Sequence, residues 1–123
     1  MDVLVRSQEG VPAHPVERSQ DAFVQVLIGP EDGTVHAVVR RFTLLPGGRI
    51  PRHKHPTVQH QQYVISGRVR VGVGTEVREV KAGDALLIPP DTPHWYENPN
   101  DEPVSFLCII PRTSGYATLW LDD

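Results

Sequence analysis

Four of the six histidines lie in two short segments, and two of them have the spacing of metal ligands. His53 and His55 form a His-x-His pattern within the stretch RIPRHKH. Alternate side chains of an extended strand point to the same face, so both imidazoles face one side. Two imidazoles placed in this way can bind a single ion, at about 2.0–2.1 Å per nitrogen for zinc. The pair therefore predicts a metal site.

Two further histidines are candidates to complete this site. His60 follows His55 after a turn that contains a proline, and His94 follows the distant stretch PPDTP. A closed sheet can bring these segments to one cavity, although the linear sequence does not require it. The alternative for the His-x-His pair is that both residues are polar surface residues of a basic loop. The alternative for His60 is that it lies at the surface, or next to the metal ligands without binding the ion. In that case Gln59 supplies the fourth ligand, or no residue does.

The segments that must position these histidines have the composition of short strands. Twelve prolines and ten glycines interrupt the chain, no long helical period is present, and the intervening segments are rich in Val, Ile, Leu and aromatic residues. This pattern predicts an all-β sandwich or barrel. The absence of crossover helices disfavours a parallel α/β sheet, and a closed antiparallel sheet also protects its edges. The expected strands are 23–28, 35–45, 58–65, 68–73, 76–80, 85–88, 95–97, 104–110 and 117–121.

Glycine and proline clusters mark the expected turns. Residues 30–33 (PEDG) predict a hairpin turn, and residues 46–48 (PGG) predict a break in the chain. Ser66 and Gly67 allow a tight reversal. Residues 81–84 and 98–101 predict two more turns.

Length and charge narrow the classes of function. A chain of 123 residues predicts one domain over residues 1–123, with residues 1–20 as a loose N-terminal arm. The net charge of −3 and the absence of a basic run disfavour nucleic acid as a partner. No apolar stretch approaches the roughly 20 residues of a membrane span, and the start has no signal-peptide pattern, so we expect a cytoplasmic protein without a membrane partner. The single cysteine, Cys108, excludes an internal disulfide.

Two motifs in this chain resemble those of the cupin superfamily. The first cupin motif, G-x5-H-x-H-x3,4-E-x6-G, fits residues 47–67, with His60 where most members have glutamate. The second, G-x5-P-x-G-x2-H-x3-N, fits residues 83–98, with Asp91 in place of its central glycine. Two motifs at this separation are far more specific than the His-x-His pair alone. The resemblance implies a double-stranded β-helix, or jelly-roll barrel.

The resemblance also implies the ligand set and the metal. His53, His55, His60 and His94 would hold one divalent metal ion per chain and act in catalysis through it, as in a minority four-histidine branch that is similar to small manganese cupins of thermophilic bacteria. Manganese or iron is favoured on that ground. Zinc, nickel and copper stay possible, because nitrogen sites bind them more tightly. Four neutral imidazoles would leave the charge of the ion uncompensated, which suits an anionic substrate with oxygen donors.

Strand alternation and the resemblance together select candidate walls of a substrate pocket. Arg40 shares the phase of Phe42 and is a candidate to meet a substrate carboxylate. Gln62 shares the phase of His60 and is a candidate hydrogen-bond donor to a metal-bound ligand. Phe106 and Cys108 share one face of their strand, where we expect them to shape the pocket and not to react.

Three functions are compatible with such a site. The first is a metal-dependent oxidoreductase, similar to a dioxygenase, that acts on a small chelating organic molecule. The second is a non-redox cyclase or isomerase with a zinc ion, as in cupin-type polyketide cyclases. The third is a non-enzymatic module that binds a small ligand. One fold hosts many chemistries, so the fold does not choose among them. We also expect a homodimer, in which strand 117–121 could exchange with a partner.

Overall fold

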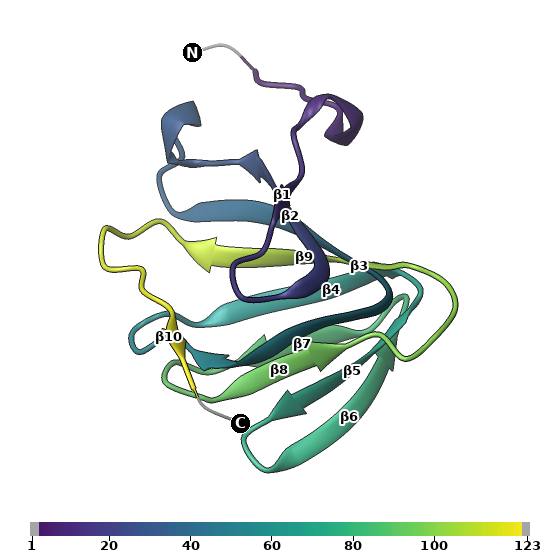
Figure 1. The fold of residues 1–123 in the computed structure, drawn as a ribbon. Helices are drawn as coiled ribbons and strands as arrows, with labels where there is room; N and C mark the ends of the chain where they lie inside the picture. Colours follow the sequence, from purple (N-terminus) through teal and green to yellow (C-terminus); the bar gives the residue numbers. More distant parts are fainter. Residues whose placement is uncertain (1–2, 122–123) are drawn as a thin grey trace.

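Residues 3–121, which the computed structural model describes, form an antiparallel sheet of strands that curls into a barrel (Figure 1). The strand order is β6-β5-β8-β3-β9-β4-β7, with β2 and β10 added along β3 and β1 added to β2. The predicted all-β jelly roll is therefore confirmed. Neither 3-10 helix within these residues is long or apolar enough to cross a membrane. The elements are η1 (Gln8–Gly10), β1 (His14–Pro15), β2 (Gln20–Ile28), η2 (Pro30–Asp32), β3 (Ala37–Lys54), β4 (His60–Ser66), β5 (Arg68–Val73), β6 (Glu76–Lys81), β7 (Ala85–Ile88), β8 (His94–Glu97), β9 (Val104–Pro111) and β10 (Leu119–Trp120).

The long strand β3 joins the two halves of the barrel. Its first half pairs with β2 on one edge and β9 on the other, and its second half pairs with β8 and β10. Our prediction that residues 46–48 break the chain was wrong, because β3 runs through them. Gly47 adopts a φ of 82° while its amide donates to the Asn98 carbonyl at 2.9 Å. The glycines thus bend the strand without ending it, since their backbone keeps its partners.

The N-terminal segment, expected as a loose arm, is attached to the barrel over part of its length. Residues 14–15 pair with β2, and the Gln25 amide donates to the carbonyls of Gln8 at 2.8 Å and Val11 at 2.9 Å. The turn between β1 and β2 contains Arg18 with a φ of 58°. This turn brings the segment to the mouth of the barrel (Figure 1).

The C-terminal segment crosses the barrel within its own chain. β10 pairs with the end of β3, where Trp120 lies opposite His53 and Leu119 opposite Lys54. The strand is shorter than the predicted 117–121, because only two residues pair with β3. This pairing covers the histidine end of the barrel without a second copy of the chain.

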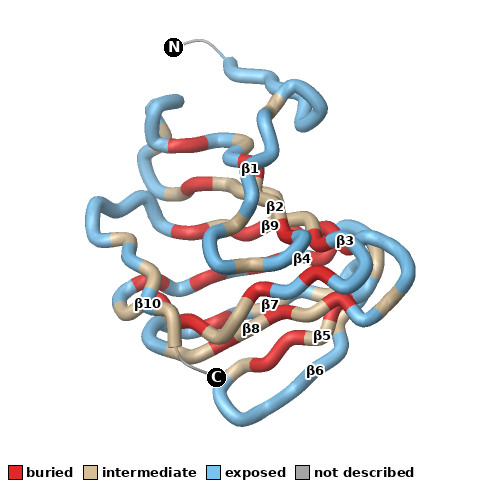
Figure 2. Tube along the Cα trace, in the orientation of Figure 1, coloured by how far each residue is buried: buried red, intermediate tan, exposed pale blue. Residues whose placement is uncertain are grey.

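The buried side chains lie along the strands, and the connecting loops are largely exposed (Figure 2). In β9 the residues expected on one face, Val104, Phe106, Cys108 and Ile110, are all buried. The buried core residues form two clusters that fill different parts of the barrel. The larger cluster consists of Ala22, Leu44, Ile50, Val64, Val69, Val71, Ile88, Tyr96, Val104 and Phe106, and the smaller of Val38, Val58, Cys108 and Ile110.

Gly67, between β4 and β5, occupies a position that only glycine fits. Its φ is 76°, and an added Cβ would contact the Pro103 carbonyl oxygen and lie 2.9 Å from the Val104 Cα. We expect Gly67→Ala to lower the free energy of unfolding by about 2–4 kcal/mol, from backbone strain and overpacking together. Gly83 also has a positive φ, of 95°, but an added Cβ there would meet open space. Gly83→Ala should therefore cost only about 1–2 kcal/mol, from backbone strain alone. Urea denaturation of both variants measures the difference, and equal losses would contradict the steric argument.

Candidate metal centre

Three strand ends and one adjacent loop position bring the histidines into one cavity. His53 lies near the end of β3 and directly opposite His94, the first residue of β8. His55 follows β3, and His60 begins β4. All four side chains are buried, with exposed fractions of 2–6%. The barrel therefore makes neighbours of segments about 40 residues apart in sequence.

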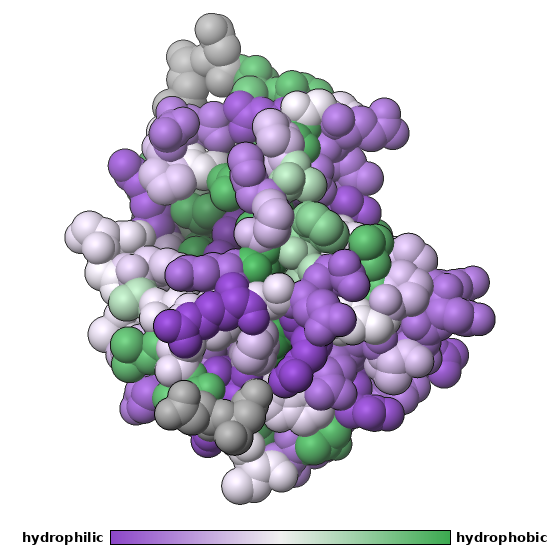
Figure 3. All heavy atoms as spheres, in the orientation of Figure 1, coloured by the Kyte–Doolittle hydropathy of each residue, from purple (hydrophilic) through white to green (hydrophobic). Residues whose placement is uncertain are grey.

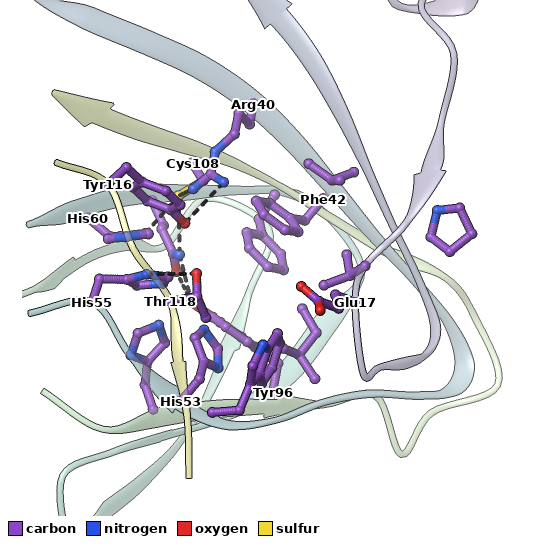
Figure 4. A pocket seen from close by; sticks show the side chains of 18 residues that line it. Glu17, Arg40, Phe42, His53, His55, His60, Tyr96, Cys108, Tyr116 and Thr118 are labelled. Carbon is purple, nitrogen blue, oxygen red and sulfur yellow. Dashed lines mark hydrogen bonds between the residues drawn. The ribbon is translucent and has the colours of Figure 1, made fainter. Parts of the chain in front are cut away.

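Three of the four imidazoles form a compact group. One ring nitrogen from each of His53, His55 and His94 lies within 4.8 Å of the others. His60 lies outside this group, but its ring stacks on that of His55 with centroids 4.3 Å apart. Gln59, the alternative fourth ligand, is exposed and does not line the cavity. The structure thus brings together His53, His55 and His94, as predicted. It places His60 beside His55 (Figure 4).

Backbone carbonyls fix which nitrogen of each imidazole carries the proton. Nδ1 lies 2.7 Å from the Pro51 carbonyl in His53, 2.9 Å from the Thr92 carbonyl in His94 and 3.0 Å from the Ala117 carbonyl in His55. A carbonyl only accepts, so each Nδ1 must donate. Each Nε2 then keeps its lone pair. Orientation of metal-binding histidines by a hydrogen bond at the other nitrogen is a general feature of metal sites.

Burial keeps these imidazoles neutral. It lowers the pKa of His55 to about 4, of His94 to about 3 and of His60 to about 2, and it also lowers the pKa of His53. The neighbouring imidazoles add to the effect, because a second positive charge in the cluster is unfavourable. At neutral pH the rings are therefore in the form that binds metal ions.

The residues present fit a divalent ion with nitrogen ligands. His60 Nε2 is buried and has no hydrogen-bond partner, which is costly for a polar atom. The three other Nε2 atoms likewise make no hydrogen bond within residues 3–121. A cation among these nitrogens would satisfy them. The donors are all neutral, as the sequence predicts, and no carboxylate belongs to the group.

The cavity beside the histidines has a volume of about 210 Å³. Its apolar wall consists of the Phe42 ring stacked on Phe106 at 5.4 Å and of Tyr96 stacked on Phe106 at 5.1 Å. Polar residues cover most of the surrounding surface, and apolar side chains are visible in its hollows (Figure 3). The five residues expected in the pocket, Arg40, Phe42, Gln62, Phe106 and Cys108, all line the cavity. Their contact with a substrate stays a prediction.

Gln62 and Cys108 belong to a hydrogen-bonded group at the back of the cavity. The Gln62 amide nitrogen lies 2.6 Å from the Tyr96 hydroxyl and 3.6 Å from Cys108 Sγ. The same sulfur lies 3.2 Å from His60 Nδ1. Burial raises the pKa of Tyr96 and keeps the phenol protonated. The group therefore positions His60 and holds the Gln62 amide, and a hydrogen bond from Gln62 to a metal-bound ligand stays a prediction.

Several cavity residues were not identified from the sequence. Tyr116 stacks on His55 with centroids 5.0 Å apart, and Trp120 lies 5.1 Å from His53. With Thr118 they alternate in a period of two, a strand signal that could have placed them inside. Glu17, on the β1–β2 turn, is the only carboxylate among the described residues that line the cavity. No sequence signal marks it, because its place depends on that turn.

Comparison with known families identifies the same fold and motif region. A family model described as a cupin domain matches residues 40–110. The polyketide cyclase RemF from Streptomyces resistomycificus superposes with a TM-score of 0.85 at 25% identity, over 100% of this chain and 89% of that one.

Curated proteins with similar sequences differ in length. The 1-methylthio-D-xylulose 5-phosphate methylsulfurylase of Rhodospirillum rubrum is 32% identical over 135 aligned positions, which cover 100% of this chain and 80% of that protein. Oxalate decarboxylase OxdC of Bacillus subtilis is 36% identical over 86 residues, 66% of this chain and 22% of that protein. The chain spans about half the length, or less, of the first curated relatives that it matches.

Removal of one histidine of the group should abolish metal binding without unfolding the barrel. We expect His53→Ala and His94→Ala to lose stoichiometric metal, because each removes a ligand nitrogen, while far-ultraviolet circular dichroism stays that of a β protein. His60→Gln should weaken metal binding less, since glutamine offers an oxygen. Elemental analysis after dialysis measures the metal content. Full metal in both alanine variants would show that the group is not the site, and an unchanged affinity in His60→Gln would show that His60 is not a ligand.

The lowered pKa values of the histidines predict the pH dependence of stability without metal. In the unfolded chain these imidazoles bind protons below pH about 6.5, whereas in the folded chain they bind them only near the lowered values. The unfolded state then holds more protons, so stability falls as the pH drops from 7 to 5. The slope should reach up to about 1.4 kcal/mol per pH unit for each histidine.

Thermal melting of the metal-free protein between pH 7 and 5 measures this slope, with His60→Gln as the comparison. The variant should show a shallower dependence, because it lacks one of the buried imidazoles. A flat profile in the wild-type protein would contradict the burial of neutral histidines.

Proposed function

The chain belongs to the cupin domain family, and from that membership we propose that it is a divalent-metal-dependent enzyme, an oxidoreductase similar to the cupin dioxygenases, that acts on a small chelating organic molecule. In this proposal His53, His55 and His94 hold the ion, and His60 is the fourth ligand. The observation that carries the proposal is the set of buried, neutral imidazoles with unpaired Nε2 atoms at the end of a cavity. Manganese or iron is the preferred ion.

The donor set decides what a bound ion would contribute. A divalent ion held only by neutral nitrogens would supply undiminished Lewis acidity and, if it is redox-active, electron transfer to dioxygen. The chain itself supplies the rest of the site. The Phe42–Phe106–Tyr96 wall excludes water from one side of the cavity, and the C-terminal Tyr116 and Trp120 rings cover the histidines.

The named relatives support a small, oxygen-rich substrate. Oxalate, which stands in the name of the Bacillus subtilis relative, is a small dianion. The relative from Rhodospirillum rubrum is named for a sugar phosphate, and it aligns with the whole of this chain. Anionic oxygen donors match the uncompensated positive charge that four imidazoles would leave on a metal ion.

A second candidate is a non-redox cyclase or isomerase with zinc. The observation that favours it is the likeness to the polyketide cyclase RemF over the whole chain. The apolar aromatic wall also suits a planar substrate, and Glu17 at the mouth is a candidate to accept a proton. In this alternative the ion polarises a carbonyl and needs no redox activity.

The proposed enzyme also has a surface suited to pairing of two chains. Tyr63 and Ile65 on β4 and Leu87 on β7 are apolar side chains with exposed fractions of 48%, 42% and 58%. Strand β7 is also the last strand of the sheet order, which leaves an edge open. We propose a homodimer on this basis.

Dioxygen uptake separates the two candidate activities. We expect protein reloaded with manganese or iron to consume dioxygen with oxalate or 2-oxo acids at about ten times or more the rate of His53→Ala, a difference of about 1.4 kcal/mol in activation free energy. Zinc-loaded protein should consume none, because zinc has no redox chemistry. Turnover of a cyclisable substrate by the zinc form without dioxygen would favour the cyclase. Stoichiometric binding of a ligand with no turnover by any metal form would favour a binding module.

A further inference from the structure

We propose that Arg40 and Tyr116 form a second anion-binding point in the cavity, so that the substrate carries a carboxylate in addition to the group held at the histidines. This inference rests on the proposed function, because it takes the histidine end of the cavity as the first binding point. It names the substrate class as small organic acids with two separated polar ends.

Arg40 is a cation inside the cavity without an anionic partner. Among residues 3–121 its guanidinium meets only the Tyr116 hydroxyl, at 3.3 Å, and Cys108 Sγ, at 3.4 Å. The distance to the Tyr116 oxygen is long for a charge-assisted hydrogen bond, which is usually about 2.7–2.9 Å between nitrogen and oxygen, and a thiol sulfur is only a weak acceptor. Arginines elsewhere do pair with carboxylates, as Arg6 does with Asp32 at 3.0 Å. Arg40 is half-buried, and its Nε is buried without a hydrogen-bond partner. Such a cation without a carboxylate is costly, and an anionic ligand would reduce that cost.

The surrounding side chains hold the guanidinium in place. Its central carbon lies 5.0 Å from the centre of the Phe42 ring and 5.3 Å from that of Tyr116. Stacking on aromatic rings restricts a guanidinium, which then loses less entropy on binding a ligand. The register of β3 and β9 also fixes Arg40 opposite Cys108. The cation is therefore positioned before any ligand arrives.

Tyr116 supplies a second donor at the same place. Its hydroxyl oxygen accepts from Arg40, which leaves the hydroxyl proton free for another acceptor. The Tyr116 ring lies 5.0 Å from His55 and 6.2 Å from His60. The phenol thus lies between Arg40 and the histidines, as Figure 4 shows. An oxygen placed there could accept from both donors.

The distance between the two binding points is short. Cys108 Sγ contacts both His60 Nδ1, at 3.2 Å, and the Arg40 guanidinium, at 3.4 Å, so the sulfur atom and the imidazole ring of His60 lie between Arg40 and the unpaired His60 Nε2. The cavity volume of about 210 Å³ likewise admits only a small molecule. A molecule that reaches from the histidines to Arg40 therefore has a backbone of a few carbon atoms.

Pairs of ligands that differ only in the second end test the inference. The probes are 2-oxoglutarate and 2-oxoadipate, each compared with the analogue whose distal carboxylate is an amide. All four carry the same 2-oxo acid end for the histidine site. Isothermal titration calorimetry on protein loaded with one zinc per chain gives each Kd without redox turnover.

We expect the distal carboxylate to tighten binding about tenfold or more at one of the two chain lengths, as for a hydrogen bond to a charged group. Arg40→Gln should bring the Kd of the amide divided by the Kd of the acid close to one, while the Kd of the amide itself changes less than about twofold. Arg41→Gln is the matched control, because the neighbouring guanidinium faces away and bonds Gln25 and Ser105 at 3.0 Å each. It should keep the full ratio.

The possible results separate the inference from the proposed function. If the amides bind but the distal carboxylate has no effect at either length, the second anion point is wrong and the proposed function stands. The same holds if Arg40→Gln keeps the ratio. If none of the four ligands binds the zinc-loaded protein, the proposed function fails and the inference fails with it. Arg40→Lys, which keeps the charge, should retain part of the ratio, and it tests the inference if the glutamine variant does not fold.

Discussion

The cavity depends on burying four imidazoles in the neutral state, three of them with a tautomer that a backbone carbonyl defines. In two of the rings a local contact fixes the tautomer, because His53 and His94 each donate from Nδ1 to the carbonyl of the residue two positions earlier. His55 instead depends on the carbonyl of Ala117, 62 positions later. The third nitrogen of the group is therefore oriented only when the C-terminal segment lies across the barrel. This requirement gives a physical reason for the pairing of β10 with β3 at His53.

The same strand faces form both the hydrophobic core and the functional cavity. Along the β3–β9 pair the inward residues change from Leu44 and Val104, through Phe42 and Phe106, to Arg40 and Cys108. The first pair is fully buried in the larger core cluster, and the last lies beside the histidines. The ladder continues to Val38 and Ile110, which are also buried, so apolar pairs on both sides of Arg40 and Cys108 set the register at the site. Stability and function are joined through strand alternation, since a slip of one residue would turn Arg40 away from the cavity.

The fold and the ligand group could be predicted because they depend on local patterns. Strands 68–73 and 85–88 have the predicted bounds, since glycines flank the first and a turn with glycine and two prolines bound the second. His53 in β3 and His55, the residue just after the strand, face the same cavity, as the alternation of an extended chain predicts. The continuation of β3 through residues 46–48 could not be predicted, because it depends on hydrogen bonds to Asn98, which is remote in sequence. Glu17 escaped prediction on the same ground, because it reaches the cavity through the β1–β2 turn, whereas Tyr116 could have been found from its alternation with Thr118 and Trp120.

The charges of the cavity act at different depths. Glu17 is exposed at the mouth, whereas Arg40 and the histidines lie deeper. Two unit charges 4 Å apart interact with about 1 kcal/mol in water and about 4 kcal/mol at the effective dielectric constant of a protein site. Water and salt therefore weaken the repulsion between Glu17 and an entering anion, while the attraction between that anion and Arg40 is screened less. Glu17 can therefore accept a proton at the mouth without preventing an anion from binding near Arg40 and the histidines. Proton transfer at the mouth and anion binding in the interior are compatible.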